Sequence, residues 1–243
     1  MVGARRVAGA GAVKRRRGAV RVEKKTKSLS SRRWLERQLN DPYVQAAREE
    51  GYRSRAAYKL IELDARFGLL RRGAKVVDLG AAPGGWSQIA AQRVKASRPG
   101  GGKVVAVDVN PIDALEGVTF LQADALDLAT IAPIQAALGQ ARADLVLSDM
   151  AAPATGHAAT DHLRVMALCE AALDIGEALL TPGGAFVAKV LKGGTERLLL
   201  ERLKRAFRTV KHAKPPSSRV DSAETYVVAL GYRGTGEAPD APG

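Results

Sequence analysis

Short apolar runs alternate with longer amphipathic patterns along most of the chain. The runs are rich in Val and other β-branched residues, which favour strands. The segments predicted as strands are Lys75–Leu79, Lys103–Asp108, Val118–Gln122, Asp144–Ser148, Ala185–Val190 and Tyr226–Leu230. Apolar residues at helical spacing separate most of them and predict helices at Trp86–Val94, Ile131–Leu138, Leu163–Leu180 and Glu196–Phe207.

This alternation predicts an α/β fold. Pro182-Gly183-Gly184 follows the third predicted helix and marks its end. Strands that alternate with helices are typical of a mostly parallel, doubly wound sheet with helices on both faces. Ligands of such folds bind beyond the carboxyl ends of the strands.

The two ends of the chain lack this pattern. Residues 1–33 are mainly Gly, Ala, Lys and Arg without hydrophobic periodicity, and residues 234–243 are rich in Gly and Pro. Neither segment can bury enough apolar area to order itself. We expect a disordered N-terminal extension at 1–33, a single domain at 34–233 and a disordered C-terminal tail at 234–243.

The net charge of +13 is concentrated in two regions. Residues 1–33 hold twelve Lys or Arg and one acid, and Val187–Arg219 holds ten Lys or Arg and two acids. A basic tail and a basic patch attract polyphosphates through counterion release, so nucleic acid is the expected partner. Two alternatives stay open for residues 1–33: a solvated tail without function, and an organellar transit peptide.

Composition excludes several kinds of site. The single cysteine, Cys169, excludes an intrachain disulfide and a cysteine-based zinc cluster, and its apolar neighbours predict a buried thiol. His157, His162 and His212 lack the spacing of metal ligands, so no metal is expected. No run approaches the ~20 apolar residues of a membrane span. We expect a soluble, cytoplasmic monomer.

A small-residue turn, Gly80-Ala81-Ala82-Pro83-Gly84-Gly85-Trp86, joins the first predicted strand to a helix. Missing side chains let the backbone approach a ligand, but the glycine spacing differs from the dinucleotide motif, which disfavours a nicotinamide dehydrogenase. Asp108 and Asp124 follow the next two strands, where they could meet the ribose hydroxyls and the adenine amino group of a nucleoside. Each alone is explained as a cap or turn residue; together they favour a cofactor without phosphates, such as S-adenosylmethionine.

Five segments resemble the FtsJ family of ribosomal RNA ribose methyltransferases. They are Ser54–Leu60, Asp78–Gln88, Ser148–Ala151, Lys189–Val190 and Ser218–Arg219, within a likeness that covers Trp34–Arg233. The resemblance implies a Rossmann-like methyltransferase fold and methylation of a ribose 2′-hydroxyl, expected to be that of a uridine in 23S ribosomal RNA. The ribosomal RNA or the large ribosomal subunit would be the partner. The residues expected to bind S-adenosylmethionine are Gly84, Trp86, Asp108, Asp124 and Asp149.

The resemblance also implies a catalytic tetrad, which carries over onto Lys59, Asp149, Lys189 and Glu224. A ribose hydroxyl is protonated at neutral pH, so catalysis must align it and assist proton removal. Lys189 lies in an apolar strand, where a charge is costly unless it is paired. We assign it as the proton acceptor, with Asp149 orienting it, Lys59 favouring its neutral form and holding substrate, and Glu224 supporting the network. The alternative is a strand-end lysine paired with an aspartate.

Two loops depart from the usual family pattern. Pro-Asn usually follows Asp149-Met150-Ala151, whereas this chain continues Ala152-Pro153-Ala154; Phe-Gln-Gly usually follows Lys189-Val190, whereas this chain has Leu191-Lys192-Gly193. We expect both loops to border the acceptor pocket. Two other functions are alternatives: a transfer RNA ribose methyltransferase, and an RNA-binding ribosome assembly factor without catalytic activity.

Overall fold

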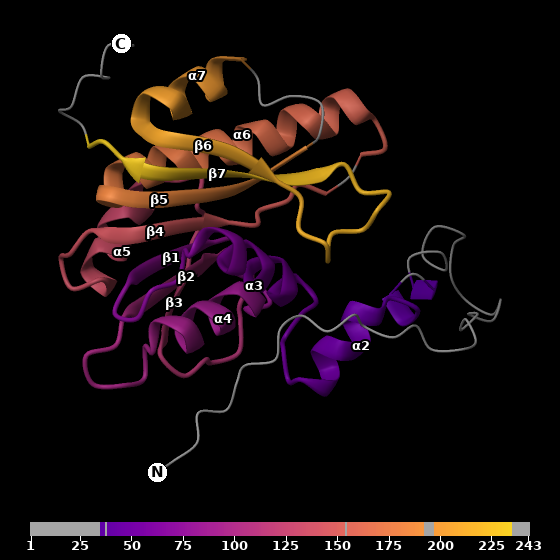
Figure 1. Cartoon of the computed structure of the whole chain (residues 1–243), viewed down its shortest axis with the longest axis horizontal. Coiled ribbons are helices and arrows are strands. Elements are labelled where there is room, and N and C mark those ends of the chain that lie inside the picture. The colour runs from indigo at the N-terminus through magenta and orange to yellow at the C-terminus, as the bar shows by residue number, and fades with distance from the viewer. Residues whose placement is uncertain (1–34, 37, 154, 192–196, 235–243) are drawn as a thin grey trace.

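The computed structural model describes residues 35–36, 38–153, 155–191 and 197–234. The expected N-terminal extension, residues 1–33, lies outside this part of the chain, and so do residues 235–243 of the expected C-terminal tail. Figure 1 shows a twisted sheet in the middle of the molecule with helices on either side of it.

The helices are α2 (Pro42–Glu49), α3 (Ala56–Phe67), α4 (Gly85–Val94), the 3₁₀ helix η1 (Leu128–Thr130), α5 (Ile131–Ala137), α6 (Ala158–Leu179) and α7 (Arg197–Ala206). The strands are β1 (Lys75–Leu79), β2 (Lys103–Asp108), β3 (Val118–Gln122), β4 (Ala143–Ser148), β5 (Leu180–Leu191), β6 (Phe207–Ala213) and β7 (Glu224–Tyr232). Within the described residues, no helix is long and apolar enough to cross a membrane.

The seven strands lie in the order β3-β2-β1-β4-β5-β7-β6. The first five are parallel neighbours, whereas β7 runs antiparallel to both β5 and β6. The sheet grows from β1 in one direction to β2 and in the other to β4, so the strand order switches between β1 and β4. In open α/β sheets the ligand crevice lies at such a switch point, beyond the carboxyl ends of the strands.

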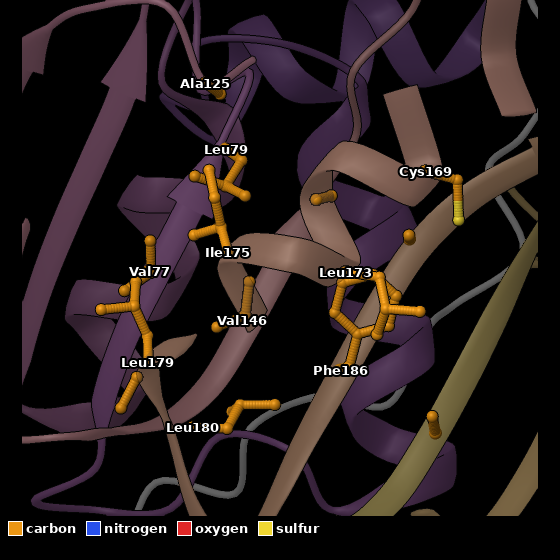
Figure 2. Packing of buried hydrophobic residues seen from close by; sticks show 14 of the residues in the cluster. Val77, Leu79, Ala125, Val146, Cys169, Leu173, Ile175, Leu179, Leu180 and Phe186 are labelled. Carbon is orange, nitrogen blue, oxygen red and sulfur yellow. The ribbon is translucent and has the colours of Figure 1, made fainter. Parts of the chain in front are cut away.

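Two apolar cores lie on the two faces of the sheet. Because the side chains of a strand alternate between faces, Val77 and Leu79 of β1 enter one core and Val76 enters the other. Helices α5, α6 and α7 contribute to the first core, and Figure 2 shows Leu173 and Ile175 of α6 among the strand residues. Helices α3 and α4 contribute to the second. The mostly parallel sheet with helices on both faces is thereby confirmed.

Cys169 of α6 is buried in the first core, as Figure 2 shows. Burial, together with the charge of Glu170, raises the pKa of the thiol to about 12. The thiol is therefore protonated at neutral pH and packs as a small apolar group. The expected buried thiol is confirmed.

The predicted elements differ from the observed ones in both halves of the chain. The bounds of β1, β2 and β3 agree with the prediction, but no range was predicted for α2, α3 or the edge strand β6. Pro182-Gly183-Gly184 was expected to separate a helix from a strand, yet it lies inside β5, which begins at Leu180. Pairing with β4 shifts in register between Ala143 and Leu145, so an irregularity in the ladder accommodates these three residues.

Candidate active site

A cavity of about 340 Å³ lies beyond the carboxyl ends of β1, β2 and β4, at the switch point of the sheet. It is lined by Gly80, Ala82, Asp108, Val109, Asn110, Asp124, Ala125, Leu126, Asp149, Met150, Ala151 and Leu168. Three of the five residues predicted to bind the cofactor, Asp108, Asp124 and Asp149, are therefore brought to one cavity. Apolar side chains, among them the exposed Val109 and Leu126, form much of the remaining wall.

Hydrogen bonds from nearby backbone N–H groups fix the side chains of Asp108 and Asp124. Asp108 accepts the N–H of Ala82 at 2.9 Å through Oδ2 and the N–H of Asn110 at 2.8 Å through Oδ1. Asp124 accepts the N–H of Leu126 at 2.9 Å through Oδ1. Each of these carboxylates thus also stabilises the turn that follows it, by accepting the N–H two residues further along. Since a carboxylate oxygen has two lone pairs, both side chains can still accept donors from a ligand.

Gly80 brings backbone to the cavity wall. Its φ of +72° lies in the left-handed region, and a Cβ added here would stand 2.4 Å from Cγ and 3.1 Å from Cα of Met150. A side chain at this position would therefore need both strained backbone and a displaced Met150. This glycine, rather than Gly84, is the one in the turn that lines the cavity.

Gly84 and Trp86 are not among the described residues that line the cavity. Trp86 is only 3% exposed, and its Nε1 donates a hydrogen bond to the backbone oxygen of Ala56 at 2.8 Å. Gly84 has a φ of +102°, and a Cβ there would be 3.1 Å from the side chain of Arg53. Both residues shape the start of α4, and their contact with a cofactor stays a prediction.

The four residues of the predicted tetrad form one ion-pair network. Lys189, near the end of β5, places Nζ 2.8 Å from Oδ1 of Asp149, which directly follows β4. The same Nζ donates to the backbone oxygen of Asp149 at 2.8 Å and lies 3.8 Å from Oε1 of Glu224, the first residue of β7. Lys59 of α3 binds Oε2 of Glu224 at 3.2 Å.

Both carboxylates of the network are held in the charged form. Burial acts to raise the pKa of Asp149, but the charges of Lys189 and Lys59, with hydrogen bonds from Lys189 and Tyr226, outweigh it and lower the pKa. Burial opposes the charged form of Glu224 as well, and the two lysines again lower its pKa. Lys189 and Lys59 are 6% and 7% exposed, whereas the side chains of Asp149 and Glu224 are 16% and 31% exposed, so the two cations are more deeply buried than the two anions.

A residue that the sequence reasoning did not single out completes this network. The hydroxyl of Tyr226 in β7 donates to Oδ1 of Asp149 at 2.6 Å. Its ring centroid lies 5.5 Å from that of Trp86 and 5.8 Å from Nζ of Lys59. A tyrosine in a predicted strand is typical of a core residue, and no sequence signal distinguishes this role.

A second cavity, of about 410 Å³, adjoins the other end of the network. Its lining consists of Gln38, Arg55, Ala56, Lys59, Arg219, Asp221, Ser222 and Glu224. Asp41, the N-cap of α2, binds Arg55 at 2.9 Å and Arg219 at 3.2 Å through one oxygen. Lys59 and Glu224 line this cavity whereas Asp149 lines the first, so the network lies between the two.

The loops that depart from the family pattern are only partly described. Met150 and Ala151 line the first cavity, whereas Lys192 and Gly193 lie outside the described residues. Among the residues that the structure describes, no group of three or more His, Cys, Asp or Glu could hold a metal ion.

A model of the FtsJ-like methyltransferase family matches residues 52–232, a range that includes the glycine turn, the tetrad and Tyr226. The chain belongs to the FtsJ-like methyltransferase family. Its relatives include the ribosomal RNA large subunit methyltransferase E of Paramagnetospirillum magneticum, which is 59% identical over 216 residues, 88% of this chain and 87% of that protein.

Two further relatives support this assignment to the FtsJ-like family. The ribosomal RNA large subunit methyltransferase E of Azorhizobium caulinodans is 55% identical over 219 residues, 90% of each chain. A solved structure of a ribosomal RNA methyltransferase from Plasmodium falciparum superposes with a TM-score of 0.67 at 30% identity, covering 75% of this chain and all of that one.

Proposed function

We propose that this methyltransferase transfers a methyl group from S-adenosylmethionine to a ribose 2′-hydroxyl of large-subunit 23S ribosomal RNA, at a uridine, with Lys189 as the proton acceptor. One observation carries the proposal: the buried Lys189 network lies between a cavity suited to a nucleoside cofactor and a second cavity lined by arginines. The ribosomal RNA as substrate rests on the names of the relatives.

The lining of the first cavity supports a nucleoside cofactor. Asp108 would accept the ribose hydroxyls and Asp124 the adenine amino group, while Val109 and Leu126 offer apolar surface to the ring. No Lys or Arg is among the described lining residues, which disfavours a phosphate-bearing ligand. When bound, S-adenosylmethionine supplies an electrophilic methyl group.

The hydrogen bonds of Lys189 indicate how it can take a proton. A lysine ammonium has three N–H donors, and Asp149 accepts two of them, at its backbone oxygen and at Oδ1. The third donor of the ammonium faces Glu224, but Oε1 of Glu224 lies 3.8 Å from Nζ, which is beyond hydrogen-bond length. A substrate hydroxyl can approach there, where the neutral amine presents its lone pair. Lys189 would then accept the hydroxyl proton and later release it to water.

The test measures transfer of labelled methyl from S-adenosylmethionine to ribosomal particles, free ribosomal RNA and transfer RNA. Lys189→Ala should bind cofactor and RNA like the wild type but lose at least ~100-fold in rate, as expected for a removed general base. Lys103→Ala is the control, because Lys103 lies at the amino end of β2, where its Nζ donates to the backbone oxygen of Leu138. Unchanged turnover in Lys189→Ala would overturn the role of Lys189.

The same assay separates the two other functions. Label in transfer RNA alone would indicate a transfer RNA ribose methyltransferase. Tight RNA binding without label in any RNA would indicate an assembly factor. The intact tetrad favours the enzyme, because an assembly factor has no need for two buried lysines paired with two carboxylates.

A further inference from the structure

Tyr226 contacts functional residues from three other elements. It lies in β7 directly opposite Lys189 of β5 in the antiparallel register, and it is fully buried. Its hydroxyl binds Asp149 at the end of β4, its ring lies near Trp86 of α4, and Lys59 of α3 lies within cation–π distance. Tyr226 is thus placed to influence both lysines of the tetrad.

The hydroxyl of Tyr226 and the ammonium of Lys189 bind the same oxygen of Asp149. The two distances to Oδ1 are 2.6 Å and 2.8 Å. Two donors on one carboxylate oxygen fix the rotamer of Asp149, which lines the first cavity. They also compete for the same negative charge, so the hydroxyl weakens the attraction between Asp149 and the charged form of Lys189.

We propose that Tyr226 is a positioning residue of the methyl-transfer reaction, whose hydroxyl orients Asp149 and eases proton release from Lys189. This inference rests on the proposed function. Tyr226 does not touch the reacting atoms and acts through Asp149.

The hydroxyl of Tyr226 is protonated at neutral pH. Burial, followed by the charge of Asp149, raises the pKa of Tyr226 well above its usual value. The charged groups that face it are Asp149 after β4, Lys59 and Arg55 from α3 and its N-cap, Lys189 from β5 and Glu224 from β7 itself. Tyr226 therefore remains a donor while the groups around it change charge.

Tyr226→Phe tests the inference because it removes the hydroxyl and keeps the ring against Trp86 and Lys59. The matched control is Tyr232→Phe: Tyr232 lies at the other end of β7, and its hydroxyl donates to the backbone oxygen of Glu177 at 3.0 Å. We expect kcat of Tyr226→Phe to fall about tenfold, as for a lost hydrogen bond to a charged group, with KM for S-adenosylmethionine changed less than about twofold. The rising limb of its kcat–pH profile should move to higher pH.

A purely structural role would leave the pH profile in place. A fall in kcat with an unmoved profile, or an unchanged kcat, would therefore overturn the inference, and Tyr232→Phe should show neither change. A second readout does not depend on turnover: in an NMR titration of the Asp149 carboxyl in cofactor-free protein, the pKa of Asp149 should be higher in Tyr226→Phe than in the wild type, because the hydrogen bond from Tyr226 is one of the interactions that lower it. If the wild type methylates no RNA, the proposed function fails, while this titration still decides whether Tyr226 acts on Asp149.

Discussion

At the scale of single residues, Asp78 is the most unusual ionisable group outside the tetrad. It lies in β1 just before the glycine turn and is fully buried. Ser87 donates to Oδ2 at 2.6 Å, whereas Oδ1 has no hydrogen-bond partner in the described part of the protein. Burial raises the pKa of Asp78 to about 7 against the opposing hydrogen bonds from Ser87, and the charges of Asp149 and Asp108 add to the rise.

This pKa predicts how stability depends on pH. Because the carboxyl holds its proton in the folded protein up to about pH 7 but loses it near pH 3.8 in the unfolded chain, the free energy of unfolding falls as the pH rises between these values. Asp78→Asn removes this loss. Relative to the wild type, the variant should gain about 2–3 kcal/mol more stability at pH 8 than at pH 5, measured by denaturant unfolding. An equal difference at both pH values would contradict the prediction.

At the scale of elements, the sequence-based prediction was most accurate where strands are buried on both faces. The Val-rich runs of β1 and β2 are typical of such strands, and their predicted bounds agreed with the structure. β6 was missed because it is an edge strand with exposed Arg208, Lys211 and His212, so it lacks the apolar run of a central strand. The missed α2 does carry a sequence signal, since Asp41 before Pro42 is a typical helix N-cap.

The site could be predicted only where a motif, or a polar residue after a predicted strand, marks it. The tetrad was predicted through the family resemblance, and its residue types are rare in apolar surroundings. The glycine-tryptophan motif predicted that Gly84 and Trp86 contact the cofactor. A motif does not distinguish a residue that lines a cavity from one that shapes the turn behind it. Tyr226 could not be predicted, because its function depends on Asp149, which lies 77 positions away in the sequence.

The turn between β1 and α4 gives a prediction at this scale. Gly80→Ala should weaken S-adenosylmethionine binding at least ~10-fold, because Met150, which lines the cavity, must be displaced to admit a Cβ. Gly51→Ala is a matched control: its φ of +74° imposes the same backbone strain, but nothing lies within 4 Å of the added Cβ. Calorimetric titration measures both. Equal losses of affinity would mean that backbone strain, and not the clash with Met150, is responsible.

At the scale of the whole molecule, charge is distributed unevenly. Residues 1–33 carry +11 of the net charge of +13. The described basic groups add a second region, since the exposed Lys204 and Arg205 of α7 are followed by Arg208 and Lys211 of β6. RNA affinity should therefore depend strongly on salt concentration.

Removal of residues 1–33 tests how much of this dependence they carry. The truncated protein should bind RNA more weakly, and the plot of log affinity against log salt should become less steep by about 0.7–0.9 for each phosphate that these residues neutralise. Removal of residues 235–243, which contain no Lys or Arg, is the control and should leave the slope unchanged. A slope unaffected by the first truncation would mean that residues 1–33 do not bind phosphate groups of the RNA.

The position of β7 sets the order in which the site can be completed. Because β7 lies between β5 and β6, its pairing with β5 joins residues 180–191 to residues that are made later in synthesis. A growing polypeptide already contains Lys59, Asp149 and Lys189 while Glu224 and Tyr226 are still missing. Lys59 and Lys189 would then have only the carboxylate of Asp149 from the tetrad, until β7 supplies that of Glu224. Activity should therefore arise only when synthesis passes β7, which would keep unfinished chains from modifying RNA.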